Sequence, residues 1–359
     1  MNQSQYSAMQ QTALVSNNGL KPVDYRSDTV SMPSEAMKLY AASCPLGDDV
    51  FEEDPTVKAL EEKVADLLGK PAALFFPTGT QSNLAAVLSH CQRGEEVLIG
   101  DNYHIYRDEA RGVSVLGGVT METMTTDKTG RLLLEDIKAA IKPDDPHCAI
   151  TRLVCLENTV SGCVQNQQEL DAIADYAHKN NLSVHLDGAR LFNAAAAQES
   201  AISDMAKKAD SVSLCLSKGL GTPAGSVLVG SRDLIKRAKR NRKMLGGGMR
   251  QVGFLAACGI YALDNNVNRL VDDHRIAKQL ANELSTIEQL EVDLDLVQTN
   301  MLFIRPRANN HQQLQEFLGQ HNVLIGGQVP FIRMVTHMDI LEEDAERTVD
   351  LFKQFYQVK

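Results

Sequence analysis

Tryptophan is absent from this sequence, and aromatic residues of all kinds make up only 5% of it. No apolar run reaches the length of about 18 residues that a membrane-spanning helix needs. Basic residues are in the minority, with 36 lysines and arginines against 46 aspartates and glutamates and a net charge of −10. This acidic balance argues against general affinity for nucleic acid or anionic membranes. The composition therefore predicts an ordinary globular protein without a membrane span.

Paired cysteine motifs are also missing. The seven cysteines are scattered, odd in number and form no CxxC pair. Several of them sit in apolar runs, as buried thiols do in a reducing compartment, so we expect no zinc site and no other metal site. Residues 1–24 lack the apolar core of a signal peptide and contain no arginine, so we expect a disordered leader and a cytoplasmic location.

Strand-like and helix-like segments alternate along the chain. Apolar runs predict strands at Ala72–Phe76, Glu96–Gly100, Leu153–Leu156, Ser183–Asp187, Ser211–Ser217, Gly225–Ser231 and Thr299–Arg305. Apolar residues at helical spacing predict a helix over Gln168–Asn180. Near-continuous apolar strands separated by helices indicate an α/β fold with a mostly parallel central sheet covered on both faces. We expect a large domain over residues 25–265 and a smaller C-terminal α/β domain over residues 266–359.

Three of the predicted strands end in unusual polar groups. Thr78-Gly79-Thr80 stands between a strand and a helix, where small residues and free N–H groups suit an anion such as phosphate. Asp187 ends the strand in HLDGAR, where a carboxylate can face a protonated pyridine nitrogen. Lys218 follows the next strand among small residues, where a partly desolvated amine can bind a carbonyl cofactor. Functional residues of such sheets collect at the carboxyl ends of strands, so the three together are a stronger signal than each alone.

Each of these residues also has an ordinary structural explanation. Thr80 or Ser82 can simply cap the helix that follows. Asp187 can pair with Arg190. Lys218 can be a solvated loop residue, as most lysines are. The basic run Lys236–Lys243 does not indicate nucleic acid in an acidic protein, because on a helix it is more often a solvated or subunit-facing stripe.

From Tyr25 onward the sequence resembles the low-specificity L-threonine aldolases, within the β-eliminating lyase group of fold-type I pyridoxal phosphate enzymes. The stretches that carry the resemblance are YRSDTVSMPSEAM, GDDVFEEDPTV, FPTGTQSNLAAVLSHCQRGEE, LDGARLFNA, CLSKGLGTPAGSVLVG, KMLGGGMRQ and IRMVTH. The resemblance implies a fold-type I architecture with pyridoxal 5′-phosphate as cofactor. It also implies retro-aldol cleavage of β-hydroxy-α-amino acids to glycine and an aldehyde, and a homotetramer built from dimers.

The resemblance also assigns roles by position. Lys218 matches the Schiff-base lysine, Asp187 the carboxylate at the pyridine nitrogen, and His104 the histidine that stacks on the cofactor ring and is the candidate base. Around the cofactor phosphate and ring it implies Thr78, Gly79, Thr80, Arg190 and Arg250. Around the substrate it implies Ser27, His104, His147, Arg190 and Arg333, of which Ser27, Arg190 and Arg333 match the residues that hold the carboxylate. Whether His104, His147 or a water is the base stays open at this stage.

Two departures from the family pattern concern substrate choice. The chain reads ENTVSG where relatives commonly read Glu-Asn-Thr-His-Asn-Gly, so Val160 replaces the histidine of that pattern and Ser161 replaces its second asparagine. Asp108 stands where relatives often carry an aromatic residue. Another reaction of the same fold, such as β-elimination or racemisation, and a non-catalytic pyridoxal phosphate-binding protein remain alternatives. A dinucleotide-dependent oxidoreductase is disfavoured, because no GxGxxG follows an early strand.

Overall fold

The structure is a computed structural model that describes residues 22–327 and 330–358. Residues 1–21 of the expected leader lie outside the described residues. The last two residues of that expected leader, Val23–Asp24, form strand β1 instead, because the buried Val23 side chain packs in an apolar core. No helix in these described ranges is long and apolar enough to cross a membrane.

The contacts within the chain divide the described residues into two compact units. The larger unit comprises residues 32–271, and the smaller unit joins the described residues up to Ser31 to those from Asp272 onward. The segment from Tyr25 to Ser31 thus belongs to the smaller unit, whereas the sequence analysis placed it in the larger domain. The physical reason is burial, since Tyr25 is fully buried in the core of the smaller unit and its hydroxyl contacts Thr348 at 3.2 Å.

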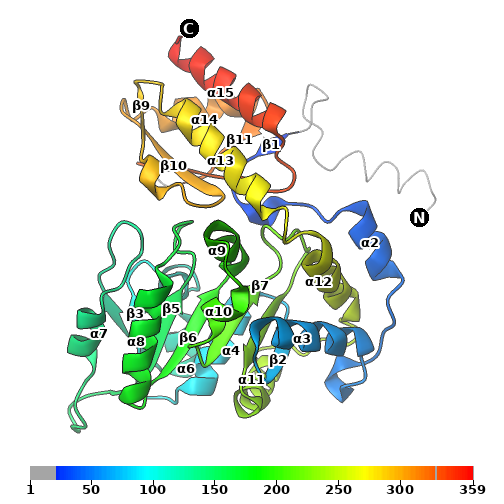
Figure 1. Ribbon diagram of the computed structural model, residues 1–359, viewed down its shortest axis with the longest axis vertical. Coiled ribbons are helices and arrows are strands. Elements are labelled where there is room, and N and C mark those ends of the chain that lie inside the picture. Colours follow the sequence, from blue (N-terminus) through cyan, green and yellow to red (C-terminus); the bar gives the residue numbers. More distant parts are fainter. Residues whose placement is uncertain (1–21, 328–329, 359) are drawn as a thin grey trace. The chain divides into compact units, whose positions relative to one another are not determined.

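In the described residues of the larger unit the centre is a seven-stranded sheet in the order β2-β8-β7-β6-β5-β3-β4 (Figure 1). Its strands are β2 (Ala72–Phe76), β3 (Glu95–Gly100), β4 (Thr120–Met124), β5 (Ile150–Glu157), β6 (Ser183–Gly188), β7 (Ser211–Cys215) and β8 (Ser226–Gly230). In this sheet β8 runs antiparallel to both of its neighbours, β2 and β7, and the other neighbouring strands pair in parallel. These strands confirm the segments predicted within this sheet, with shifts of a few residues at the ends.

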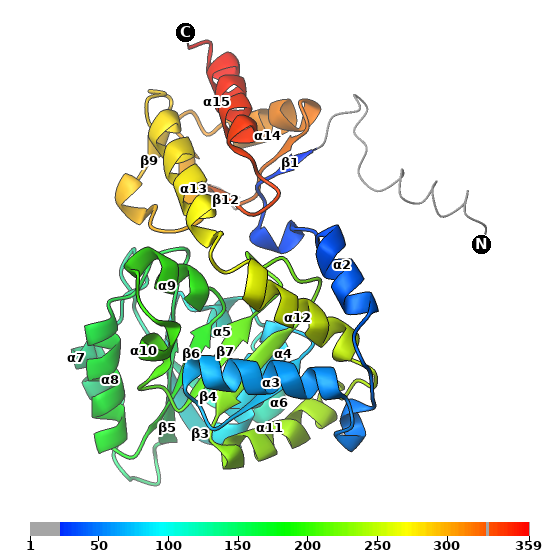
Figure 2. The same cartoon turned by 45° about the vertical axis from the view of Figure 1, so that its right-hand side comes forward.

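Helices cover both faces of this sheet, which is why its strands carry so few charged residues. Figures 1 and 2 show α3, α8 and α10 on one face and α4, α6 and α11 on the other. The helices and short 3-10 turn of this unit are α2 (Glu35–Ala42), η2 (Asp49–Phe51), α3 (Pro55–Leu68), α4 (Gly79–His90), α5 (His104–Arg107), α6 (Gly112–Gly117), α7 (Leu134–Ala140), α8 (Gln167–Lys179), α9 (Leu191–Gln198), α10 (Ile202–Ala206), α11 (Arg232–Met244) and α12 (Gly253–Asn265). All seven cysteines lie in described segments and are free thiols.

Local sequence signals define the ends of these helices. In α3, the Asp54 carboxylate accepts hydrogen bonds from the N–H groups of Thr56 and Val57, and Pro55 occupies the first turn. Gly69 ends the same helix with φ +62, a conformation that favours glycine. In α8, Asn166 caps the first turn in the same way.

The smaller unit has its own sheets and its own apolar core. Strands β9 (Leu290–Val292), β10 (Met301–Pro306) and β12 (Ile332–Val335) form an antiparallel sheet, and β1 pairs in parallel with β11 (Val323–Leu324). The sheets are accompanied by η1 (Asp28–Val30), η3 (Leu294–Leu296), α14 (His311–Gln320), α15 (Glu342–Tyr356) and α13 (Leu270–Leu284), which begins at the boundary of the units. Strand β10 confirms the strand predicted at Thr299–Arg305.

One basic residue of the run Lys236–Lys243 is buried. The run lies on α11, and Arg242 within it is only 3% exposed. Its guanidinium donates to the Asp49 carboxylate at 2.7 Å and to the main-chain oxygen of Phe75 at 2.6 Å. Arg242 therefore ties α11 to η2 and β2 through a buried ion pair, and the expectation of a solvated stripe is wrong at this position.

We predict that Arg242→Ala lowers the free energy of unfolding by about 3 kcal/mol, because it leaves the buried Asp49 carboxylate without its partner. The matched control is Lys239→Ala, on the same helix, where the ion pair with Glu52 is exposed and should contribute less than about 1 kcal/mol. Urea denaturation of both variants measures the difference. Equal, small losses in the two variants would contradict the structural role of Arg242.

Candidate active site

A cavity of about 280 Å³ opens at the end of the large sheet where β2, β3, β6 and β7 have their carboxyl ends. Its lining includes Thr78, Gly79, Thr80, His104, Asp187 and Lys218. Because β8 runs antiparallel, the loop that precedes it lies at the same end and contributes Pro223 and Ala224. The sheet thus gathers in one cavity polar groups that are up to 140 positions apart in the sequence.

Asp187 is a buried side chain of the cavity that two hydrogen bonds hold in place. It is 2% exposed, and Oδ1 accepts a hydrogen bond from the N–H of Ala189 at 3.0 Å. Oδ2 accepts from the side-chain amide Nδ2 of Asn83 on α4 at 2.9 Å. Two N–H donors therefore hold the two oxygens of this carboxylate in place. The arrangement fixes the Asp187 carboxylate at the floor of the cavity.

His104 begins α5 and contacts two further carboxylates. Its Nδ1 lies 2.9 Å from Glu109 Oε1, and its main-chain N–H donates to Glu157 Oε2 at 2.6 Å. Glu109 is 6% exposed and also accepts from Asn83 Nδ2 at 2.9 Å. Because Nδ1 is engaged by Glu109, the other ring nitrogen of His104 is the one available to a bound molecule.

These carboxylates perturb the acid–base properties of the site. The hydrogen bond with Glu109 raises the pKa of His104, while burial and the positive charge of Lys218 act in the opposite direction. Burial raises the pKa of Glu109, and its hydrogen bond with His104 opposes that rise. Burial and repulsion by Asp187 raise the pKa of Glu157. A titratable imidazole beside closely spaced carboxylates is an arrangement typical of proton transfer.

Lys218 lies in the loop between β7 and β8 and lines the cavity. The main-chain oxygen of Lys218 accepts from the N–H of Gly221 at 2.9 Å, so the loop turns directly after the lysine. Gly225, at the end of the loop, has φ +119, and a Cβ there would lie 2.8 Å from the Phe75 ring. The glycine therefore permits both the turn and the close packing that bring Lys218 to the cavity.

The Thr78-Gly79-Thr80 turn forms the start of α4. Thr78 is its N-cap, and its Oγ1 accepts from the N–H of Gln81 at 3.2 Å. This leaves the first N–H groups of the helix, those of Gly79 and Thr80, for an anion. Ser226 Oγ is buried without a hydrogen-bond partner among the described residues, and it lies 3.4 Å from where a Cβ on Gly79 would be. The turn therefore combines the capping role with groups that suit a phosphate.

A metal ion is the other group that this site could hold in principle. Ligand atoms of His104, Glu109 and Asp187 lie within 4.8 Å of one another, and no other such group occurs in residues 22–327 and 330–358. The Asn83 amide, however, donates to both carboxylates from between them. An N–H group between the two carboxylates would repel a cation bound there. These residues therefore fit an organic cofactor with a ring nitrogen better than they fit a metal ion.

Three other residues of the larger unit that the sequence singled out are not among the described residues that line the cavity. Arg190 is half-buried at the N-cap of α9, three positions after Asp187. Arg250 is exposed and pairs with Asp48 at 3.4 Å. His147 has a 91% exposed side chain and pairs with Asp145 at 2.7 Å. It precedes the amino end of β5, whereas the cavity lies at the carboxyl ends, so the chain does not bring His147 to it.

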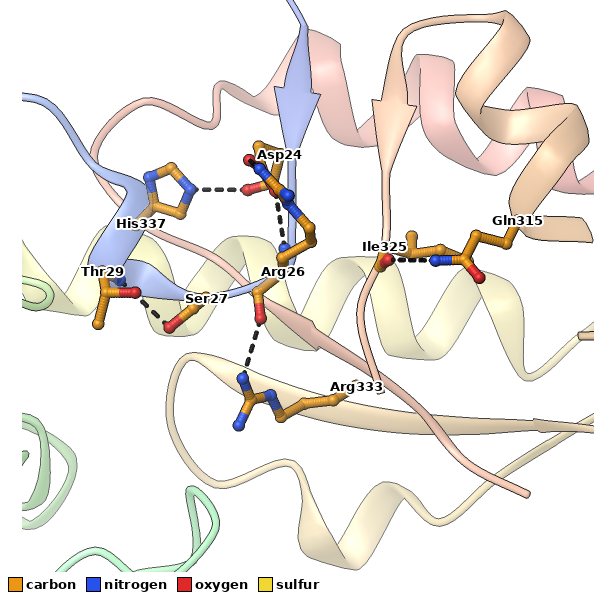
Figure 3. Close-up of polar contacts among 8 residues, drawn as sticks. All are labelled: Asp24, Arg26, Ser27, Thr29, Gln315, Ile325, Arg333 and His337. Carbon is orange, nitrogen blue, oxygen red and sulfur yellow. Dashed lines mark hydrogen bonds and ion pairs between the residues drawn. The ribbon is translucent and has the colours of Figure 1, made fainter. Parts of the chain in front are cut away.

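The smaller unit brings two of the predicted residues, Ser27 and Arg333, near each other (Figure 3). Nη2 of Arg333, on β12, donates to the main-chain oxygen of Arg26 at 3.0 Å, next to Ser27. Ser27 Oγ accepts from the N–H of Thr29 at 3.3 Å and so caps η1. Arg26 itself forms a bidentate pair with Asp24, whose main-chain oxygen accepts from His337 at 2.8 Å.

The positions that depart from the family pattern lie outside the cavity lining described above. Asp108 is exposed at the C-cap of α5. Val160 is 1% exposed and packs closely against Gly130, where a Cβ would lie 2.2 Å from the valine. Ser161 is exposed with φ +49.

The sequence analysis missed Asn83, Glu109 and Glu157. Glu157 is the last residue of β5, and Asp187 is the last but one of β6, so the strand-end signal could have found Glu157. Asn83 and Glu109 carry no such signal. Their position depends on how α4 and the segment after α5 pack against the sheet, which a single sequence does not encode locally.

Comparisons with known proteins show which family and which fold this chain resembles. The profile of the family described as "Beta-eliminating lyase" matches residues 24–307. A low specificity L-threonine aldolase of Escherichia coli (strain K12) is 47% identical over 333 residues, covering 93% of this chain and 99% of the relative. A probable low-specificity L-threonine aldolase of Arabidopsis thaliana is 41% identical, covering 96% and 99%. A solved threonine aldolase of Leishmania major superposes with a TM-score of 0.79 at 21% identity, covering 93% of this chain and 100% of that one. The predicted fold class is confirmed.

We predict that Glu109→Gln lowers the pKa of His104. The carboxylate stabilises the imidazolium, so its removal takes away the largest influence that raises this pKa, while burial and the charge of Lys218 remain. An NMR titration of the His104 ring signals in the protein without added ligand measures the shift. The control is Asp108→Asn, which removes an exposed carboxylate one position earlier. An unchanged or higher pKa in the Glu109 variant would contradict this account of the site.

Proposed function

Because the chain belongs to the β-eliminating lyase family, we propose that it is a pyridoxal 5′-phosphate-dependent aldolase. Its substrates would be L-threonine, L-allo-threonine and related β-hydroxy-α-amino acids, which it cleaves between Cα and Cβ to glycine and an aldehyde. The observation that carries this proposal is the convergence of Lys218, Asp187 and the Thr78-Gly79-Thr80 turn on one cavity. The identity of 47% with a low specificity L-threonine aldolase supports the choice of reaction.

The cofactor supplies an electron sink for the pair of electrons released when the Cα–Cβ bond breaks. Lys218 is the amine that would hold its aldehyde carbon, since Lys218 lines the cavity in which Asp187 and the phosphate turn also lie. The N–H groups of Gly79 and Thr80, with the field of the α4 N-terminus, would hold the phosphate. Arg190 and Arg250 remain proposed contacts by resemblance alone.

Asp187 would hold a proton on the pyridine nitrogen of the cofactor. Its carboxylate is buried and held by two N–H donors, and a carboxylate beside the ring nitrogen would stabilise the protonated form of that nitrogen. This arrangement is why an aspartate, and not an asparagine, suits the position.

His104 is the proposed general base that takes the proton from the substrate β-hydroxyl. Glu109 orients the ring through Nδ1, which leaves Nε2 for the substrate. The base must be neutral to accept a proton, and the pKa of His104 is raised by Glu109. Activity governed by this step would therefore increase as the pH rises through the pKa of His104.

The substrate carboxylate is assigned to Ser27, Arg190 and Arg333 by the family resemblance. Within the smaller unit, Ser27 and Arg333 lie near each other, as a shared carboxylate would require. The planar fork of an arginine binds a carboxylate through two parallel hydrogen bonds. His147 is exposed on this chain, so His104 is favoured over His147 as the base.

The proposal includes a cytoplasmic homotetramer assembled from dimers. Support comes from exposed apolar side chains on α2, η2, the end of α11, the segment that follows it and the start of α12, namely Leu39, Tyr40, Phe51, Met244, Met249 and Phe254. Apolar surface of this kind is typical of contacts between subunits. Light scattering coupled to size-exclusion chromatography is expected to give four times the chain mass, and a monomer at micromolar concentration would contradict it.

The direct test of the function is turnover with defined products. The protein reconstituted with pyridoxal phosphate should convert L-threonine to equal amounts of glycine and acetaldehyde. Lys218→Ala should fall below about one-thousandth of that rate, a loss of roughly 4 kcal/mol of transition-state stabilisation. Lys208→Ala, which removes an exposed partner of Asp175, is the control and should keep the rate.

Each other outcome excludes a different part of the proposal. Ammonia with a keto acid would indicate elimination instead of aldol cleavage, and a changed stereocentre alone would indicate racemisation. Turnover like that of the wild type in Lys218→Ala would exclude the role of Lys218.

A further inference from the structure

A row of polar side chains lies on one buried face of β6 and β7. Alternation along the strands puts His185 and Asp187 on the same face of β6, and Ser211 and Ser213 pair with them on β7. All four are at most 2% exposed. Helix α4 covers this face, and burial of polar groups there is costly unless each finds a partner.

Side chains of α4 supply those partners. Ser213 Oγ donates to Ser82 Oγ at 2.7 Å. His185 Nε2 lies 3.2 Å from Asn83 Oδ1, and its Nδ1 lies 2.8 Å from Ser211 Oγ. Ser211 Oγ in turn lies 2.8 Å from Nε2 of His90, the last residue of α4. A continuous chain of hydrogen bonds thus runs from His90 through Ser211 and His185 to Asn83.

The orientation of the Asn83 amide follows from charge. Its Nδ2 contacts Asp187 Oδ2 and Glu109 Oε1, both at 2.9 Å, and it has one hydrogen for each carboxylate. A flipped amide would place its oxygen against both carboxylates and would be repelled. Asn83 Oδ1 therefore faces His185, and because this oxygen only accepts, His185 Nε2 must carry a hydrogen.

The remaining hydrogens of the chain are then determined. Burial lowers the pKa of His185 to about 3 and that of His90 to about 4, so both rings are neutral at ordinary pH. A neutral ring with a hydrogen on Nε2 has an acceptor at Nδ1, so the Ser211 hydroxyl donates to His185. The Ser211 oxygen then accepts from His90 Nε2. Each member donates in the same direction, toward the carboxylates.

We propose that His185, held in its Nε2–H form by Ser211 and His90, is a positioning residue that fixes the Asn83 amide toward Asp187 and Glu109. His185 lies behind the described lining of the cavity and acts only through Asn83. The consequence for the cofactor rests on the proposed function. If the cavity binds pyridoxal phosphate, the fixed amide keeps the Asp187 carboxylate aimed at the ring nitrogen.

The first test needs no cofactor. The protein is labelled with ¹⁵N in its histidines alone, and solid-state NMR identifies which ring nitrogen of each carries hydrogen; the signal missing in His185→Gln assigns His185. The expected result is hydrogen on Nε2 and none on Nδ1. A His185 ring with hydrogen on Nδ1 would overturn the proposal.

The second test measures pyridoxal phosphate binding by fluorescence quenching in matched variants. His185→Phe removes the donor and should weaken binding roughly fivefold or more, whereas His185→Gln keeps an N–H within reach of Asn83 and should restore most of it. In an Asn83→Ala background, His185→Phe should not weaken pyridoxal phosphate binding any further, because His185 acts only through Asn83. If His185 were needed only for the stability of the fold, His185→Phe would weaken binding in this background too. His178→Gln, at an exposed pair with Asp210, is the control.

The outcomes separate this proposal from the proposed function. If the wild-type protein does not bind pyridoxal phosphate, the proposed function is contradicted. The NMR result on the His185 tautomer would still decide whether the hydrogen-bond chain is as described. Equal binding by wild type and His185→Phe would overturn the positioning role. If His185→Phe does not fold, Ser211→Ala replaces it and should give a mixture of His185 tautomers with weakened binding; a pure Nε2–H form with unchanged binding would overturn the proposal.

Discussion

The side-chain amide of Asn83, which donates one hydrogen to Asp187 and the other to Glu109, is the interaction on which the site depends. Two buried carboxylates repel each other, and the amide between them offsets that repulsion without adding a charge of its own. The amide thus holds Asp187 at the floor of the cavity, while Glu109 remains the partner of His104. The acid–base properties of both ends of the site are linked through this one group.

The fold explains how such different side chains come to share one cavity. The strands that carry them run in parallel, so their carboxyl ends meet at the same end of the sheet. Helix α4 contributes twice, because its first turn presents the Thr78-Gly79-Thr80 groups and its buried side presents Asn83. A rotation of α4 about its axis would therefore disturb the phosphate turn and the carboxylates together.

Much of the fold and part of the site could be predicted from the sequence. The strands showed as apolar runs, and Thr78, Asp187 and Lys218 line one cavity as their places at strand ends suggested. His104, which only the family resemblance pointed to, lines the same cavity. Asn83 and Glu109 were missed because their roles arise from packing between distant segments. His147 matches a family residue by its position in the sequence. It nevertheless precedes the amino end of β5, whereas the cavity lies at the carboxyl ends of the strands. Val23 and Asp24 looked like part of a polar leader, and only pairing with β11 makes them a strand.

The central claim is that Lys218 is the residue that binds the cofactor carbonyl. The most direct measurement is reduction of the pyridoxal phosphate-loaded protein with borohydride, followed by digestion and mass spectrometry of the labelled peptides. The account predicts the pyridoxyl label on the peptide that contains Lys218. A label on another lysine, or no label on a protein that has bound the cofactor, would contradict it.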